Sequence, residues 1–196
     1  MEQDAREEIR IIREMLEKTK RATAETGTLF IVWGVLITLA LIGDIVLGVL
    51  KLWRWEWLNW TAMTAVGWVY SVLYGIRKGK SAGVRTYVGT ASRHIYFSCG
   101  MGFVLVGLVF PAIGVYSYEA IIVLIAAVTG ILFFAVGGVS EWRMFKWLGL
   151  FWWTGAVAMG FVSSDSRIPI YTGLFLFGFL IPAFRMRSRY RRGLDL

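Results

Sequence analysis

Residues Thr28–Leu50 read TLFIVWGVLITLALIGDIVLGVL and contain one ionisable side chain, that of Asp44. A transmembrane helix needs about 20 predominantly apolar residues, and this stretch is long enough. We therefore expect the chain to enter a lipid bilayer here. In lipid the backbone polar groups must be satisfied within the segment itself, so a helix is expected.

The composition of the whole chain is typical of a protein that crosses the membrane several times. Of the 196 residues 57% are hydrophobic, the mean hydropathy is +0.62, and there are 10 Trp and 22 Gly residues. Trp collects at membrane interfaces and Gly allows close helix packing. The net charge of +8 lies where membrane topology would place it, so no nucleic-acid partner is predicted. The single Cys99 cannot form an internal disulfide.

Further hydrophobic segments follow the first one. They are Leu58–Ile76, Ile95–Val115, Ala120–Ser140, Trp147–Val162 and Pro169–Phe184. Most approach the length of a span, and the short fifth segment is expected to begin before Trp147. The predicted fold is an all-α integral membrane bundle of six transmembrane helices, arranged as three hairpins. A cytoplasmic amphipathic helix (1–26) precedes the transmembrane domain (27–184), and a basic cytoplasmic tail (185–196) follows it.

The distribution of basic residues predicts the orientation of the bundle. With six spans, 18 of the 21 Lys and Arg residues fall on one face, and only Lys51, Arg54 and Arg167 fall on the other. Cytoplasmic loops carry an excess of Lys and Arg. Both termini are therefore expected in the cytoplasm, with the protein in the inner (cytoplasmic) membrane.

Trp residues, small residues and Pro residues predict where the helices meet the membrane interface, where they pack closely and where they begin or end. Trp53, Trp55, Trp57 and Trp60 follow the first span. Their interpretation is interfacial anchoring, and a platform for a carbohydrate or a quinone is the alternative. Small residues four apart, such as Ala126 with Gly130 and Ala156 with Gly160, predict close helix contacts. Pro169 is expected as a first helical residue, while Pro111 and Pro182 lie toward span ends. No internal repeat is apparent, although divergence would disguise an inverted one.

The N-terminal segment carries a narrow stripe at helical spacing that includes Ile9, Ile12 and Leu16. Through Glu25 the segment has six basic and seven acidic residues. A helix that lies on anionic lipid is usually dominated by Lys and Arg, so this stripe is predicted to bind a protein partner or a second copy of the chain. Packing against the protein's own cytoplasmic loops is the alternative.

Asp44 is the candidate for ion chemistry. A carboxylate inside a span is costly and should face other helices or water. It could bind a proton or a cation, with Glu119 near the same boundary of the membrane. The structural alternative is a carboxylate paired with Arg54, Lys51 or a neighbouring hydroxyl.

Basic residues next to the spans are candidates for contact with anionic lipid headgroups. They are Arg77, Lys78, Lys80, Arg85, Arg185, Arg187 and Arg189. Gly79, Lys80 and Ser81 resemble the end of a phosphate-binding loop, but Gly75 stands one residue too close and a strand does not precede it. Membrane topology alone also explains these charges.

No catalytic, cofactor or metal motif is found. His94, Ser98 and Cys99 lie close in sequence, yet no group that would orient the histidine as a base is apparent. Haem would need a second ligand or an attachment motif. The chain is therefore predicted to be non-enzymatic, with no cofactor.

Two sequence stretches carry a family resemblance. The charged segment IIREMLEKTKR (11–21), a short polar hinge, and FIVWGVLITLALIGD (30–44) follow one another, with the pair Trp33 and Gly34 in the first span. This combination resembles the start of a group of small, uncharacterised bacterial polytopic membrane proteins. The resemblance covers about the first 50 residues, implies a bacterial inner-membrane location, and implies no activity.

The leading functional hypothesis is a non-enzymatic interaction or regulatory membrane module that works through its N-terminal helix. The alternative is a small transporter or channel that uses Asp44, with Glu119, as its proton- or cation-coupling group. An intramembrane enzyme ranks third.

Overall fold

The structure, a computed structural model, describes residues 2–79 and 87–184. Within them the chain is helical and contains no strand. The α-helices are α1 (Glu2–Val49), α2 (Glu56–Gly79), α3 (Tyr87–Val104), α4 (Phe110–Ala112), α5 (Ile121–Val139), α6 (Arg143–Gly160) and α7 (Ser164–Phe175). The π-helical segments η2 (Leu105–Val109) and η4 (Leu176–Leu180) continue α3 and α7, and the 3-10 turns η1 (Trp53–Trp55) and η3 (Tyr118–Ala120) precede α2 and α5. The all-α prediction is confirmed for this part of the chain.

Four of the helical segments are long and apolar enough to cross a membrane. They are Thr28–Val49, Gly89–Ala112, Tyr118–Val139 and Ser166–Phe184. The other two predicted spans coincide with α2 and α6, which have 24 and 18 residues. Trp, Tyr, Asn and Lys side chains make these two helices more polar, so their membrane crossing stays a prediction.

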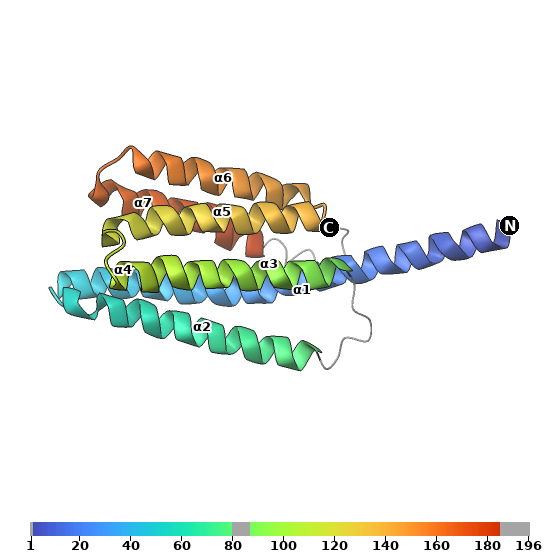
Figure 1. The fold of residues 1–196 in the computed structure, drawn as a ribbon, viewed down its shortest axis with the longest axis horizontal. Helices are drawn as coiled ribbons and strands as arrows, with labels where there is room; N and C mark the ends of the chain where they lie inside the picture. The colour runs from blue at the N-terminus through green and yellow to red at the C-terminus, as the bar shows by residue number, and fades with distance from the viewer. Residues whose placement is uncertain (1, 80–86, 185–196) are drawn as a thin grey trace.

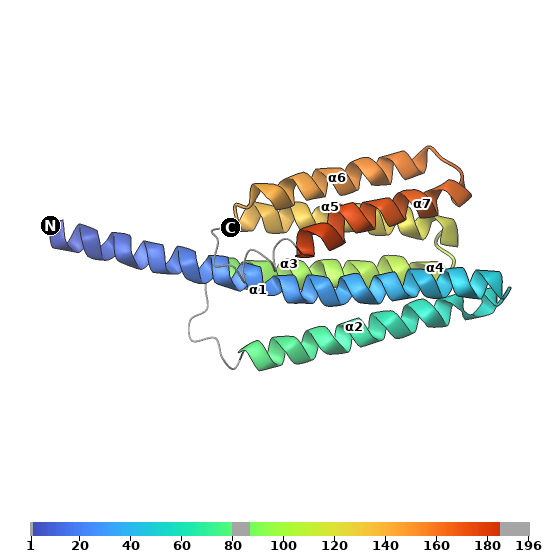
Figure 2. The same ribbon diagram turned by 180° about the vertical axis from the view of Figure 1, so that it is seen from behind.

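The helices lie side by side in one elongated bundle, and the first part of α1 projects beyond it (Figures 1 and 2). We call residues 2–27 of α1 the arm, and the end of the bundle from which it projects the arm end. The opposite end, where α1 turns into α2 and α6 turns into α7, is the turn end. α2 packs mainly against α1 and lies at the periphery of the bundle.

The arm and the first span form one uninterrupted helix. A polar hinge was expected between them, but α1 runs from Glu2 to Val49 without a break. A Gly in a helix interior costs about 1 kcal/mol relative to Ala, and one such residue, Gly27, does not end a helix that is formed on both sides. The expected hinge is therefore wrong.

The last helix begins earlier than expected. Ser163 has an extended backbone and precedes α7, which starts at Ser164 and contains Pro169 in its interior. The prediction that Pro169 is the first helical residue is wrong, because the polar residues before it already form helical turns. The fifth predicted span does begin before Trp147, at Arg143, as expected.

The tightest helix pair is α5–α6, which the three-hairpin prediction placed in two different hairpins. Glycines explain this pairing. A Cβ atom added at Gly149 would lie 2.9 Å from the Gly130 carbonyl oxygen, and one at Gly137 would lie 2.7 Å from the Lys146 nitrogen. The two backbones touch where side chains are absent, as expected where lipid offers no hydrophobic drive between helices.

An aromatic cluster joins α1 to the other helices in the half of the bundle nearer the arm. Phe30 stacks on Phe133 of α5 at 5.6 Å between ring centroids and meets Phe179 of η4 edge-on at 5.3 Å. Phe145 of α6 lies 5.5 Å from Phe133. All four side chains are buried. The root of the arm is therefore fixed within the protein core.

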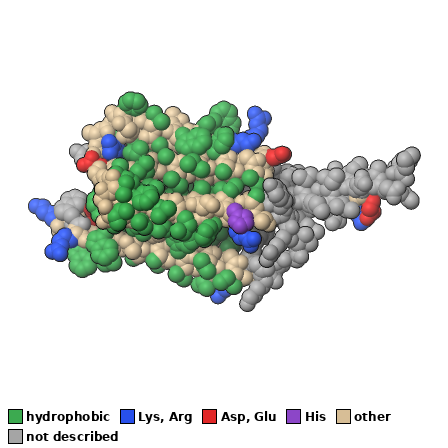
Figure 3. All heavy atoms as spheres, in the orientation of Figure 1, with side chains coloured by type: hydrophobic (Ala, Val, Ile, Leu, Met, Phe, Trp, Pro, Cys, Tyr) green, Lys and Arg blue, Asp and Glu red, His purple; other side chains and the backbone are tan. Residues whose placement is uncertain are grey.

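The outer surface of the bundle is apolar between its two ends. Hydrophobic side chains cover the middle of the face in Figure 3, and charged side chains lie toward both ends. Exposed side chains include Val69 at 59% and Val157 at 61%, on different helices. Large exposed apolar surfaces mark contact with other proteins or with a membrane. This distribution is compatible with a membrane protein.

Candidate functional site

Asp44 connects α1 to α2 near the turn end. Its Oδ1 atom accepts a hydrogen bond of 2.8 Å from Asn59 Nδ2, and its Oδ2 atom accepts one of 2.6 Å from Trp60 Nε1. Hydrogen bonds to a carboxylate are stronger than those between neutral groups. We call Asp44, Asn59 and Trp60 the clamp.

Local structure places the clamp residues opposite one another. The chain reverses through Lys51, which has a φ of 56°, so the start of α2 lies beside the end of α1. Asn59 Nδ2 also donates to the Ala40 carbonyl at 2.8 Å. A Cβ atom at Gly43 would lie 2.8 Å from Asn59 Oδ1, so this glycine makes the room that Asn59 occupies.

The clamp differs from the partners expected for Asp44. Lys51 and Arg54 were expected, but both side chains are exposed, and the hydrogen bonds found for the Asp44 carboxylate within the described residues come from Asn59 and Trp60. The prediction of a basic or hydroxyl partner is wrong. A flexible cation at the turn end can reach water, whereas Asn59 and Trp60 lie on the helix face that packs against α1.

Glu119 belongs to a different network at the turn end. Its Oε2 atom accepts a hydrogen bond from the Ser164 hydroxyl, at 2.5 Å. Arg167 donates through Nη1 to the Glu119 carbonyl at 3.0 Å and through Nε to the Met159 carbonyl at 3.1 Å. These contacts tie η3 to the α6–α7 turn. They do not join Glu119 to the clamp.

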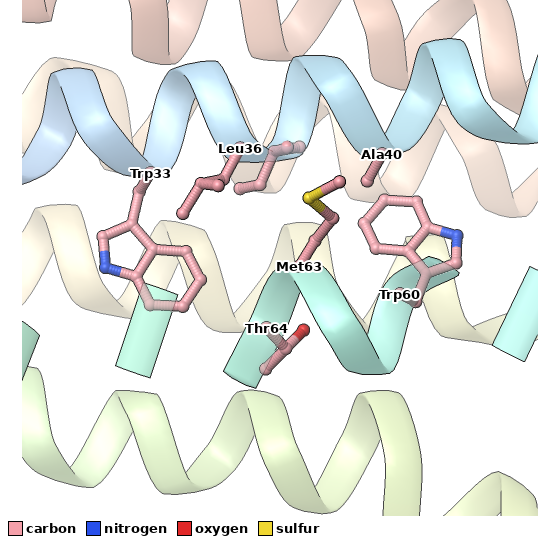
Figure 4. A pocket seen from close by; sticks show the side chains of 7 residues that line it. Trp33, Leu36, Ala40, Trp60, Met63 and Thr64 are labelled. Carbon is pink, nitrogen blue, oxygen red and sulfur yellow. The ribbon is translucent and has the colours of Figure 1, made fainter. Parts of the chain in front are cut away.

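A small cavity lies beside the clamp, between α1 and α2 (Figure 4). Its lining residues are Trp33, Leu36, Ile37, Ala40, Trp60, Met63 and Thr64. The volume is about 10 Å³, close to the least space that one water molecule needs. The lining is almost entirely apolar, and this cavity has no room for a larger ligand.

The tryptophans after the first span do not behave alike. Trp55 and Trp57 are exposed at 54% and 62%, as an interfacial anchor would be. Trp60 is instead half-buried and bonded to Asp44. The expected group of four anchors therefore includes one residue of the clamp.

The remaining candidate residues are only partly described by the structure. Arg77 and His94 are exposed, as is Ser98, while Cys99 is buried. The structure places Lys78 in α2 and the residues Ile9, Ile12 and Leu16 in α1 without describing their side chains. Lys80, Arg85, Arg185, Arg187 and Arg189 lie outside the described residues. Their predicted roles stay predictions.

Comparison with models of known protein families, with curated proteins and with solved structures finds no match for this chain. The resemblance to small bacterial membrane proteins is therefore left as a prediction. Asn59 and Ser164 were not singled out from the sequence, and Arg167 was named there only for its place in the charge distribution. The signal for Asn59 is an amide side chain at the start of an otherwise apolar segment, three residues after Glu56.

Proposed function

We propose that the protein is a bacterial inner-membrane protein with six spans and with both termini in the cytoplasm. The four apolar helices support a membrane location. The lengths of α2 and α6 support two further spans, since about 20 residues cross a bilayer. The excess of Lys and Arg at the arm end supports a cytoplasmic location for the arm.

Within this membrane frame, the proposed function is that of a non-enzymatic interaction or regulatory module. The single observation that carries it is the continuity of α1, whose arm extends past the bundle (Figure 2). Most of the stability of helices in proteins comes from tertiary packing of one face rather than from helix propensity. A protein partner or a second copy of the chain would supply such contacts to the part of α1 that projects from the described bundle.

Continuity also links the two ends of the molecule. The same helix carries the arm, Phe30 in the aromatic cluster, and Asp44 in the clamp. Helical hydrogen bonding keeps such a segment stiff. Binding at the arm would therefore reach the α1–α2 contact without an intervening joint.

A variant with polar residues in the stripe of the arm tests the proposed interaction with a partner or a second copy. We expect the combined substitution Ile9→Asn, Ile12→Asn and Leu16→Asn to dissociate an oligomer or a co-purified complex in nanodiscs. Light scattering and mass spectrometry of the full-length protein would measure this. Ile11→Asn is the matched control, because Ile11 lies on the opposite side of the helix and should leave the assembly intact. Unchanged assembly in the stripe variant would refute the proposal.

A second candidate function is transport of protons or cations through Asp44. One observation supports it, namely a carboxylate within an apolar helix. The clamp geometry favours a structural role, since both carboxylate oxygens already accept hydrogen bonds. Flux in proteoliposomes separates the two functions. A pH- or cation-dependent flux that is abolished by Asp44→Asn would favour transport, whereas no flux in the unchanged protein would exclude it.

A further inference from the structure

One eight-residue pattern, which was not recognised as an internal repeat from the sequence, occurs twice in the chain. Leu105–Ala112 reads LVGLVFPA and Leu176–Ala183 reads LFGFLIPA. The first, third, seventh and eighth residues are identical, namely Leu, Gly, Pro and Ala, and the other four are apolar in both copies. The spacing is the same, and the copies lie in the third and the last of the six long helical segments.

Both copies adopt the same uncommon backbone. The first five residues of each form a π-helix, η2 in one copy and η4 in the other. The sixth residue then donates its N–H to the carbonyl of the first, from Phe110 to Leu105 and from Ile181 to Leu176. Single-turn π segments are rare in proteins, and those that occur are often located at functional sites.

Proline explains the π segments. Pro111 and Pro182 have no N–H, and in an α-helix their rings would clash with the carbonyls of Gly107 and Gly178, four residues earlier. The wider turn moves those carbonyls away from the ring. Kinks in helices are almost always found at such Pro residues and π-bulges.

An aromatic side chain bonds to each π segment. The Trp152 indole Nε1 donates to the Gly178 carbonyl at 3.1 Å, and the Tyr116 hydroxyl donates to the Val106 carbonyl. Gly178 lies four residues before its proline and Val106 lies five residues before its own. In each copy a side-chain donor thus reaches a carbonyl four or five residues before the proline.

The two copies have opposite directions in the bundle. α3 runs from the arm end to the turn end, and α7 runs from the turn end to the arm end (Figure 1). η2 therefore lies toward the turn end and η4 toward the arm end. η4 also contacts α1, because Phe179 meets Phe30 and Leu180 lies over Gly34.

We infer that η2 and η4 are a pair of inverted hinges, one near each end of the bundle, and that the hydrogen bonds from Tyr116 and Trp152 hold them closed. Hinges absorb a change in backbone angles at a few residues. Opening of η4 would move Phe179 and Leu180 away from α1 at the arm end. Opening of η2 would move the segment after Pro111 at the turn end. The inference does not depend on a partner for the arm.

Spin-label distances in the full-length protein in nanodiscs test this inference. In a Cys99→Ala background, labels at Arg93→Cys and Phe184→Cys report on the arm end, and labels at Ile113→Cys and Phe161→Cys report on the turn end. All four native side chains are exposed. We expect a second, longer distance in each pair, because each hinge has an open state.

Substitutions assign each opening to its hinge. Trp152→Phe should increase the population of the longer distance between the arm-end labels, and Pro182→Ala should abolish that population. Neither substitution should change the distances between the turn-end labels. Pro111→Ala should act only at the turn end. Trp153→Phe is the matched control, since the Trp153 indole bonds Ala127 of α5 and not a π segment. If Trp152→Phe loses helical circular dichroism, it is not correctly folded, and the proline variants then carry the test, because they restore a backbone N–H donor.

One narrow distance at both ends, unchanged by both proline substitutions, would overturn the inference. So would equal changes at both ends after one substitution, since separate hinges predict separate responses.

Discussion

The hairpins α1–α2 and α5–α6 are both antiparallel helix pairs, yet they are held together by different chemistry. In α1–α2 polar side chains cross the contact, from Asn59 and Trp60 to Asp44. In α5–α6 the backbones meet at glycines such as Gly130 and Gly149, and one side-chain hydrogen bond, from Trp153 Nε1 to the Ala127 carbonyl, crosses the contact as well. Helices in lipid associate through close packing and through hydrogen bonds, and the two pairs combine these means in different proportions.

The difference has a consequence for stability. A packed glycine contact has no side chain that can rotate out of the way, so the α5–α6 pair resists rearrangement. A polar contact depends on a few groups whose loss leaves the helices intact. We therefore expect α5–α6 to be the fixed part of the bundle and α2 to be the part that separates first.

The largest effect is expected from Gly149→Ala. The new Cβ atom would lie 2.8 Å from the Phe134 Cβ atom and 2.9 Å from the Gly130 carbonyl oxygen. Overpacking of this kind costs about 3 kcal/mol, and thermal unfolding in detergent should show it. Gly160→Ala in the same helix is the control, because nothing lies within 4 Å of its Cβ position. Equal stability of the two variants would contradict the glycine contact.

A smaller loss is expected from Asp44→Ala. The substitution leaves the Asn59 and Trp60 donors without their acceptor, at a cost of about 1–2 kcal/mol. Hydrogen exchange should increase in α2 and remain unchanged in α5 and α6. Asp44→Asn keeps one acceptor oxygen and should show an intermediate effect. Increased exchange in all helices would mean that the clamp holds more than α2.

A still smaller loss is expected from Ser71→Ala. This change removes the hydrogen bond of 3.0 Å from Trp33 Nε1 to the Ser71 hydroxyl, which itself donates to the Gly67 carbonyl. Such a bond within a membrane protein is worth about 0.6 kcal/mol on average. Thermal unfolding should show this loss. Trp33→Phe should lose more, because the indole ring also packs over Gly67, and the double variant should lose no more than Trp33→Phe alone.

The smallest effect concerns Glu56 at the start of α2, two residues before the predicted span. Burial and, secondarily, the nearby Asp44 carboxylate raise the pKa of Glu56. A raised pKa in the folded state gives stability at low pH that is lost as the pH rises through that pKa. Glu56→Gln should therefore unfold at a slightly higher temperature than the unchanged protein at pH 7, with no advantage near pH 4. The advantage should shrink in the Asp44→Asn background.

The sequence predicts the helical class well, because long apolar stretches have few other solutions. It does not predict the rotation of each helix about its axis. For Asp44 the sequence offers binding of a proton or cation, or pairing with Arg54, Lys51 or a neighbouring hydroxyl. Its partners lie 15 and 16 residues further along the chain, on the face of α2 that rotation brings toward α1.

Small residues show the same limit. Gly130 was expected in a close contact and is in one, but Gly160, also expected, has open space around it. The spacing of small residues indicates that another helix could pack closely against a glycine. Whether a helix lies there depends on the tertiary arrangement. Pro169 was misplaced for a related reason, since the polar residues before it gave no apolar signal for a helix.

The unbroken α1 also sets a mechanical scale for the molecule. The arm is about 40 Å long at 1.5 Å per residue, and if α1 turned as a rigid lever its fulcrum would be the aromatic cluster around Phe30. A tilt of about 10° at that fulcrum displaces the tip of the arm by roughly 7 Å, by the same geometry. Within the bundle, the shorter side of the lever moves Asp44 by a few ångström at most. A large displacement of the arm tip would thus accompany a small displacement of Asp44 in the clamp.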